Sequence, residues 1–256
     1  MKLARMLSGT VAACLLFHPN VNADIIFVED FEDSDITYLS ASTDALSDVS
    51  NKDYFGRLST GQLPPTVYYQ NYQGTGFYGV QDTDSAQPLA VDDVVLTWQN
   101  IDISQWQNLS LSWFIAEADA GDGNEDLDAN TEFSIDTQIN KSGYNPLFSV
   151  RSAGGTNNQA RVDTNFDGIG DGATISNAFT QYTRELLLGS VLDIQVTFAN
   201  FDAGDEDFAF DQLMLTGERK AINTVPEPAS LVMMLIALLL LFCKDIIIRQ
   251  RFFRLN

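Results

Sequence analysis

Short runs of alternating apolar and polar residues dominate the sequence between residues 24 and 222. An alternation with a period of two places successive side chains on opposite faces of a β-strand, so each run predicts a strand with one buried face. Glycine-rich stretches such as 74–76 and 121–124 separate the runs and predict turns. The sequence therefore predicts a single all-β sandwich, and only residues 178–188 suggest a helix. The expected strands are 25–28, 94–98, 109–115, 133–136, 191–198 and 208–215.

Cysteine and histidine are almost absent from the sequence. The cysteines are Cys14 and Cys243, each in an apolar stretch near one end of the chain, and the single histidine is His18. The body between these ends therefore excludes a disulfide, a thiol nucleophile, a Ser-His-Asp triad and a zinc site made of His and Cys. Any catalysis in the body would have to rest on carboxylates or on an unusual Lys or Tyr.

The chain is strongly acidic, with 35 acidic and 14 basic residues and a formal net charge of −21. Such a charge repels the phosphates of nucleic acids and anionic lipid head groups, so we expect no nucleic-acid partner. It suits metal cations, or a neutral partner met across bridging cations. Plain solubility explains it equally well.

Both ends of the chain have the composition of segments that interact with membranes. Residues 1–23 combine two early cations, an apolar stretch and small residues before Asp24, which is typical of a secretory signal peptide. Residues 229–243 are apolar except for Ser230, and with 246–248 they approach the length of a membrane-spanning helix. Because cations follow this run, we expect the C-terminus to stay on the cytoplasmic side and the acidic body to be exported.

The residues just before the apolar run are Val225, Pro226, Glu227 and Pro228. The two prolines favour an extended backbone, which a protease-like cleft could accept. Together with the apolar run and the basic tail, the motif resembles the PEP-CTERM sorting signal, here over residues 223–256. The resemblance implies recognition by an exosortase, removal of the tail, and a place at the cell surface or in an exopolysaccharide matrix (biofilm). A single-span anchor is the alternative.

The loop at residues 163–171 has the spacing D-x-N-x-D-G-x-G-D. Alternate side chains of such a loop point inward and can place oxygens around one hard cation, and the glycine permits a sharp turn. The loop resembles those of EF-hands, dockerins and thrombospondin type 3 repeats, except that Thr174 stands where EF-hands have a bidentate Glu. A self-capped Asp/Asn turn is the alternative to calcium. The expected calcium ligands are Asp163, Asn165, Asp167, Asp171 and the carbonyl of Ile169.

The first and last expected strands, which begin near Phe27 and Phe208, resemble the terminal strands of jelly-roll modules of the carbohydrate-binding and galactose-binding-like kind. The resemblance implies that the two strands pair, and that Glu32 and Asp211 ligate a structural calcium ion. Two further acidic loops follow expected strands, so the fold could bring them to one rim. Their weaker candidate ligands are Asp122, Asn124, Asp126, Asp205 and Asp207.

Three functions follow from these patterns. The leading interpretation is a non-catalytic exported surface or matrix protein with a calcium-stabilised sandwich. The second is a carbohydrate-binding module that stacks sugars on exposed aromatic rings. The third is a glycosidase or lyase that uses Glu132 and Asp136, which share a strand face, with Glu117 on a neighbouring strand. The candidate sugar-stacking residues are Tyr68, Tyr69, Tyr72 and Tyr78.

Overall fold

The computed structural model describes residues 23–33, 35–118 and 127–221, together with Ile236. The chain divides into two units, Met1–Arg219 and Lys220–Asn256, and the sandwich belongs to the first. The signal peptide expected at residues 1–23 and the sorting signal expected at 223–256 lie almost wholly outside the described residues. Within the described part, no helix has the length and apolar character needed to cross a membrane.

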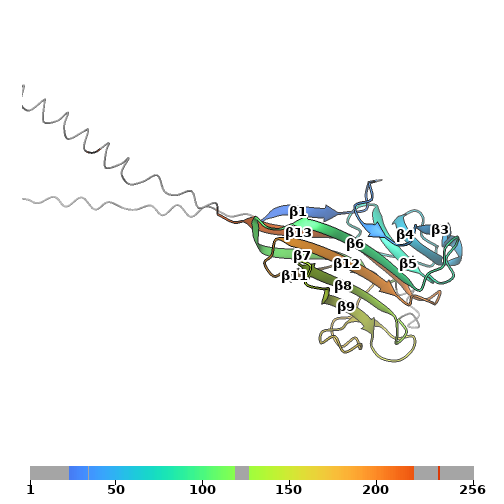
Figure 1. Cartoon of the computed structure of the whole chain (residues 1–256). Coiled ribbons are helices and arrows are strands. Elements are labelled where there is room, and N and C mark those ends of the chain that lie inside the picture. Colours follow the sequence, from blue (N-terminus) through green and yellow to red (C-terminus); the bar gives the residue numbers. More distant parts are fainter. Residues whose placement is uncertain (1–22, 34, 119–126, 222–235, 237–256) are drawn as a thin grey trace, which may run out of the picture. The chain divides into compact units, whose positions relative to one another are not determined.

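Two antiparallel sheets form the sandwich, as the arrows in Figure 1 show. The first sheet has seven strands in the order β11-β7-β13-β5-β4-β3, with β1 added beside β13. The second has six strands in the order β10-β9-β8-β12-β6-β2. One short 3-10 helix, η1, covers Val49–Asn51. The strands are β1 (Asp24–Glu29), β2 (Leu39–Ser40), β3 (Ala45–Asp48), β4 (Asp53–Ser59), β5 (Gly76–Gln81), β6 (Asp93–Asp102), β7 (Trp106–Ala116), β8 (Glu132–Ile139), β9 (Asn145–Ser152), β10 (Ala160–Val162), β11 (Thr180–Glu185), β12 (Val191–Ala199) and β13 (Asp207–Arg219).

Aromatic side chains fill the space between the two sheets. Phe133 of β8 stacks on Phe208 of β13 with 4.7 Å between the ring centroids, and Trp113 meets Phe148 edge-on at 5.0 Å. Both pairs join one sheet to the other, and all four rings are buried. Burial of large aromatic side chains is the main term that holds such a sandwich together, since no disulfide is available.

A second, smaller core covers the outer face of the seven-stranded sheet. Its centre is formed by Tyr54, Tyr69, Phe77 and Phe179, which come from β4, β5 and the loops that cross that face. The Gln70 amide donates a hydrogen bond to the Asn177 carbonyl and the Gln70 carbonyl accepts one from the Phe179 amide, so the 60–75 loop and the 172–179 loop are tied together over the sheet. The outer face of this sheet is therefore covered, and the carboxylates on it are not simply solvated.

The strand registers define two ends of the sandwich. At the terminal end, β1 begins at Asp24, β13 ends at Arg219 beside Trp106, and β12 begins at Val191 beside Asp102. The loops at this end are 140–144, which joins the paired strands β8 and β9, and 103–105 and 186–190, which each cross from one sheet to the other. At the acidic end lie the loops 82–92, 127–131 and 200–206, which contain many of the carboxylates discussed below.

All six strands expected from the alternation lie within observed strands, and β1 pairs with β13 as the jelly-roll resemblance implies. The helix suggested for residues 178–188 is wrong. Residues 180–185 form β11, which pairs with β7 along its whole length from Thr180–Ile115 to Glu185–Ser110. The run contains β-branched and aromatic residues, and the open edge of β7 provides hydrogen-bond partners that outweigh a weak helical pattern.

Candidate metal sites

Asp211 lies where β13 changes its pairing partner. Residues 207–210 of β13 pair with β5, and residues 213–217 pair with β1. Between these two segments the register shifts, and Gln212 has a positive φ of 48°. The end of β1 and the start of β5 therefore both meet β13 near Asp211, which brings the acidic residues just after β1 toward its carboxylate.

Glu32 is held at this junction by the turn before β5. Its Oε1 accepts hydrogen bonds from the backbone amides of Thr75 (2.7 Å) and Gly76 (2.8 Å), and its Oε2 accepts one from the Thr75 hydroxyl (2.9 Å). A Cβ at Gly74 would stand 2.1 Å from Glu32 Oε1, so only glycine permits this approach. Partial burial raises the pKa of Glu32, but these hydrogen bonds outweigh it and hold the pKa below its usual value.

The carboxylate of Asp211 is buried and has no hydrogen-bond partner of ordinary geometry within the described residues. The residue is 1% exposed, and both carboxylate oxygens are inaccessible to solvent. Burial raises the pKa of Asp211 to about 7, and the nearby charges of Glu32 and Asp30 add to this rise. The backbone amides of Gln212 and Gln73 oppose the rise without cancelling it. A buried carboxylate in this state either takes up a proton or needs a cation.

These observations fit the calcium ligands that the jelly-roll resemblance implies. Glu32 and Asp211 are 179 positions apart in the sequence numbering, yet the fold brings them close enough for their charges to interact. A hard cation such as calcium prefers oxygen ligands and would satisfy the buried oxygens of Asp211. Among the described residues, Asp30, Glu32 and Asp211 do not form a group of three carboxylates whose oxygens lie within reach of one ion, so calcium at the junction of β1, β5 and β13 stays a prediction.

A different group of carboxylates gathers at the acidic end. Carboxylate oxygens of Asp128, Asp202 and Glu206 all lie within 4.8 Å of one another, an arrangement that could hold a metal such as calcium. Glu206 is buried, accepts hydrogen bonds from the amides of Asp128 and Asp202 (2.8 Å each) and binds the Thr131 hydroxyl. Desolvation raises the pKa of Glu206 and also that of Asp202, where the charges of Asp84 and Asp128 contribute.

The two acidic loops thus meet at one rim, as the sequence suggested, but through other residues than those proposed. Asp122, Asn124 and Asp126 lie outside the described residues. Asp205 does not belong to the triad, and Asp207 turns toward the second core, where it accepts hydrogen bonds from the Tyr69 hydroxyl (3.0 Å) and the Ala118 amide (2.8 Å). Only tertiary structure unites Asp128 with Asp202 and Glu206, so no local spacing reveals this triad.

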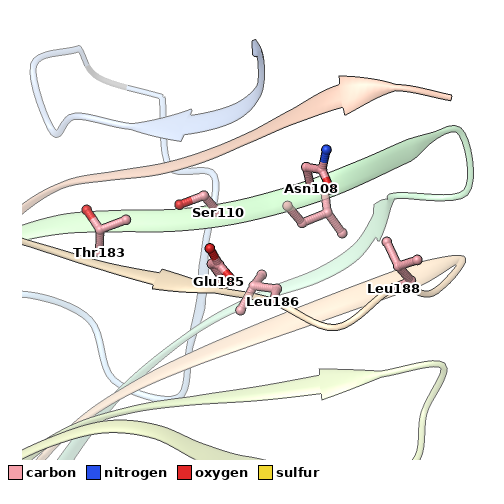
Figure 2. A pocket seen from close by; sticks show the side chains of 7 residues that line it. Asn108, Ser110, Thr183, Glu185, Leu186 and Leu188 are labelled. Atoms are coloured by element: carbon pink, nitrogen blue, oxygen red, sulfur yellow. The ribbon is translucent and has the colours of Figure 1, made fainter. Parts of the chain in front are cut away.

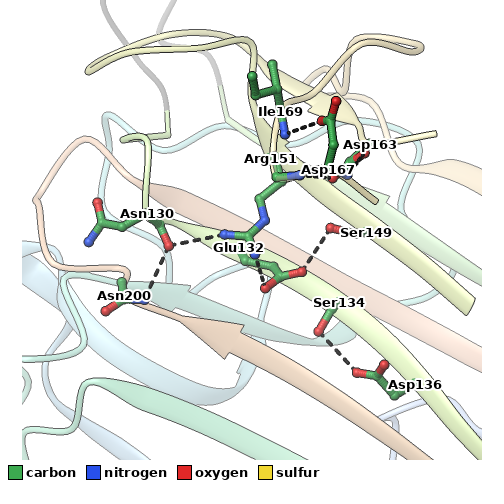
Figure 3. A network of polar contacts seen from close by, with 11 residues as sticks. Asn130, Glu132, Ser134, Asp136, Ser149, Arg151, Asp163, Asp167, Ile169 and Asn200 are labelled. Carbon is green, nitrogen blue, oxygen red and sulfur yellow. Dashed lines mark hydrogen bonds and ion pairs between the residues drawn. The ribbon is translucent and has the colours of Figure 1, made fainter. Parts of the chain in front are cut away.

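The 163–171 loop is held mainly by its own side chains. Asp163 is buried and accepts hydrogen bonds from the amides of Asp167 (3.3 Å) and Gly168 (2.8 Å). Asp167 accepts one from the amide of Ile169 (3.1 Å), as Figure 3 shows, and Asn165 contacts the Asp167 carboxylate and amide. Asp171 instead accepts from the amide and hydroxyl of Thr164, which lower its pKa. Among the described residues, the carboxylates of this loop do not form a group of three like that at the acidic end. Calcium binding by this loop stays a prediction.

The four tyrosines proposed as sugar-stacking residues do not form one surface. Tyr78 lies in the main core and Tyr69 in the second core, with 0% and 1% exposure, so a sugar ring cannot stack on either. Tyr72 packs partly buried against Phe77 and Phe179. Only Tyr68, which is 63% exposed, offers an open ring. Burial in the two cores therefore removes Tyr69 and Tyr78 from the expected sugar-stacking set, and sugar binding at Tyr68 stays a prediction.

The fold separates one of the three carboxylates proposed for catalysis from the other two. Glu132 and Asp136 do share the outward face of β8, where Glu132 is ion-paired with Arg151 and bonded to Ser149 (Figure 3). Burial and the charge of Glu132 raise the pKa of Asp136. Glu117, however, follows β7 in the other sheet and is not on a neighbouring strand. Consecutive strands β7 and β8 lie in opposite layers, which local sequence does not show.

The fold is a two-sheet antiparallel sandwich, with one group of three carboxylates that could hold a metal ion. No protein-family model matches the sequence, and no curated protein sequence is significantly similar.

Among solved structures, similar chains include the K3 cleaved adhesin domain of Lys-gingipain from Porphyromonas gingivalis w83 (13% identity, 76% of this chain and 99% of that chain, TM-score 0.39). Others are the family 11 carbohydrate-binding module from Clostridium thermocellum (12%, 78% and 98%, 0.36) and the Stig cyclase Fisc from Fischerella sp. TAU (13%, 78% and 92%, 0.41). These similarities are too distant to assign an activity or a ligand.

Proposed function

We propose that this chain is a non-catalytic exported protein of the cell surface or extracellular matrix, with a jelly-roll sandwich stabilised by calcium at Glu32 and Asp211. In this proposal an exosortase recognises Val225–Pro228, and the apolar run at 229–243 holds the chain in the inner membrane until then. The observation that carries the calcium part is the Asp211 carboxylate, which is buried beside two further acids and has no hydrogen-bond partner of ordinary geometry in the described part of the chain.

Calcium is favoured over protonation because several acidic groups lie close together. The charges of Glu32 and Asp30 both act unfavourably on that of Asp211. If Asp211 were buried alone, uptake of one proton would be enough to neutralise it. A divalent cation lowers the energy of two carboxylates at once, and the hydrogen bonds to Glu32 keep that group ionised and fixed in place. The site would then tie β1 to β13 at the point where the ladder is interrupted.

A calcium titration of the melting temperature tests this proposal on residues 24–222 purified in chelator. At a calcium concentration about 100 times the Kd, binding to the native state alone adds roughly 2.7 kcal/mol, which corresponds to a rise of about 5–10 °C for a domain of this size. Magnesium should give a much smaller rise, because it demands stricter geometry and keeps its waters.

Three variants locate the ion. Asp211→Ala should abolish the calcium-dependent rise, whereas Asp171→Ala and Glu206→Gln should retain it. If Asp171→Ala abolishes the rise and Asp211→Ala does not, the ion lies in the 163–171 loop. Loss in Glu206→Gln alone assigns the ion to the acidic end. An unchanged melting temperature at millimolar calcium contradicts the proposal for all three places.

Carbohydrate binding is the second candidate, and Tyr68 is the observation that favours it. Its ring is 63% exposed on the loop that covers the seven-stranded sheet. An exopolysaccharide of the host would be the partner, and retention without cleavage on that polysaccharide, reduced in Tyr68→Ala, would distinguish this function from a purely structural one.

A further inference from the structure

The terminal end of the sandwich exposes apolar side chains on its loops. Leu187 and Leu188, between β11 and β12, are 80% and 60% exposed, and Tyr144, between β8 and β9, is 38% exposed. Exposing two adjacent leucines at a loop tip is unfavourable in water, and such clusters often mark a surface that meets another molecule or a membrane.

Two hollows adjoin the exposed leucines Leu187 and Leu188, which are therefore loosely packed. One hollow of about 380 Å³ lies along β7 and includes Leu109, Leu186 and Leu188, and Figure 2 shows Leu188 beyond the end of β11. A second hollow of about 330 Å³ lies toward β8 and β9 and includes Ile139, Leu147 and Leu187. These leucines are therefore not covered by the sandwich itself.

Side chains suited to a lipid–water interface accompany the leucines. The Arg219 guanidinium lies 5.1 Å from the centroid of the Trp106 ring and 4.0 Å from the Asp24 carboxylate. Lys141, on the 140–144 loop, has a half-exposed side chain whose ammonium is ion-paired with Asp193 at 2.7 Å. Trp, Tyr and long cationic side chains place an apolar body and a polar tip across the boundary between lipid and water. Acids are present at both ends: Asp128, Asp202 and Glu206 form a cluster at the acidic end, whereas Glu185 lines both hollows at the terminal end.

The position at which the chain leaves the sandwich indicates what this end of the domain would contact. Strand β13 leaves the sandwich at Arg219, and the apolar run begins at Ala229. The segment 220–228 spans about 30 Å at most when fully extended. Because β13 itself is roughly 40 Å long, the acidic end lies beyond the reach of a short tether while the terminal end lies within it.

We propose that the terminal end of the sandwich docks on the surface of a phospholipid bilayer, with Leu187 and Leu188 entering the interface beside Tyr144 and Trp106. This inference rests on the proposed insertion of the 229–243 run, which brings the bilayer within reach. Docking fixes the orientation of the sandwich, so that the acidic end and its carboxylates face away from the membrane.

Lipid quenching of a site-specific fluorophore tests the docking. The full chain, with Cys14 and Cys243 replaced by serine, is reconstituted in phosphatidylcholine–phosphatidylglycerol liposomes that contain lipids with a nitroxide near the headgroup. Leu188→Cys carries an environment-sensitive nitrobenzoxadiazole label, and Leu89→Cys on the 82–92 loop is the matched control, since Leu89 is an exposed leucine (42%) at the acidic end. We expect a blue-shifted emission and strong quenching at position 188 and neither at 89.

A second reporter keeps both leucines intact. The label at Tyr144→Cys should be quenched by the same lipids, and adding Leu187→Gln with Leu188→Gln should lower the docked fraction by on the order of tenfold. These positions are exposed, so the substitutions should leave the melting temperature unchanged. Equal quenching at 188 and 89, or no loss in the double variant, overturns the proposal.

Two controls distinguish a failure of the docking from a failure of the proposed membrane anchor. A label on native Cys243, in a chain that lacks only Cys14, reports insertion through lipids with a nitroxide deep in the acyl chain. Quenching at 243 without quenching at 188 overturns docking alone, while no quenching at 243 overturns the proposed anchor and the docking with it. A blue shift at 188 without lipid quenching means that the apolar run or a second copy of the chain covers the leucines, which also overturns it.

Discussion

Asp211 makes the stability of the cation-free protein depend on pH. Its folded-state pKa is about 7, well above the ordinary value of 3.8, so the folded protein binds a proton where the unfolded chain does not. In chelator, the free energy of unfolding should therefore fall as pH rises from about 4 to about 7, by up to roughly 4 kcal/mol from this group alone. Denaturant unfolding measured across this pH range checks the expectation.

Asp211→Asn is the informative variant for this effect. It removes the titrating group and keeps the size of the side chain, so the fall between pH 4 and 7 should become much shallower. Above pH 7 in chelator the variant should be more stable than the natural protein, and in calcium it should be less stable. A variant with the same pH profile as the natural protein would show that another carboxyl, such as Glu206 or Asp82, governs the titration.

At the scale of elements, the 163–171 loop provides its own hydrogen-bond acceptors. Asp163 is buried and its carboxylate accepts hydrogen bonds from two backbone amides, whereas the exposed Asp171 carboxylate accepts from the amide and hydroxyl of Thr164. We expect Asp163→Ala to lower the free energy of unfolding by about 2–4 kcal/mol even without calcium, and Asp171→Ala to lower it much less. Urea unfolding of the two variants in chelator measures the difference, and equal losses would contradict the observed division of roles.

The sequence predicts those elements whose side-chain pattern is local. The alternation at 109–115 and 208–215 indicates β7 and β13 because each strand has one face in the main core. It does not predict β5, where all six residues are buried because loops cover the outer face, or β11, which takes its form from the edge of β7. Calcium at Glu32 and Asp211 was expected from a resemblance and stays a prediction, whereas the Asp128 triad was missed because it depends on which loops meet.

At the scale of the whole molecule, removal of the proposed tail would change the mass of the mature protein. The sorting motif and the basic cluster lie outside the described sandwich, so removal of the tail should leave the sandwich folded. In a host with an exosortase, we expect the mature protein to lack both residues 1–23 and the residues beyond the 225–228 motif, as measured by intact mass spectrometry. Replacing Pro226 and Pro228 with alanine should retain the tail and leave the protein in the inner membrane.

A single-span anchor would give a different result. In that case the mass of the mature protein would include the C-terminal residues in both the natural and the alanine-substituted chain, and both would fractionate with the inner membrane. The same fractions also show where the protein resides, since a surface or matrix protein appears in the outer or extracellular fraction only when the motif is intact.

Strand β13 is shared by β1, β5 and β7, yet it is the last strand of the sandwich to be synthesised. The first sheet therefore lacks its central strand until almost the whole domain has been synthesised. Strand β1 is made first but cannot pair until β13 is complete. Folding that depends on such distant pairing is slow and late. If the chain is exported as proposed, such late folding would keep it able to pass through a translocation channel while it is still being made.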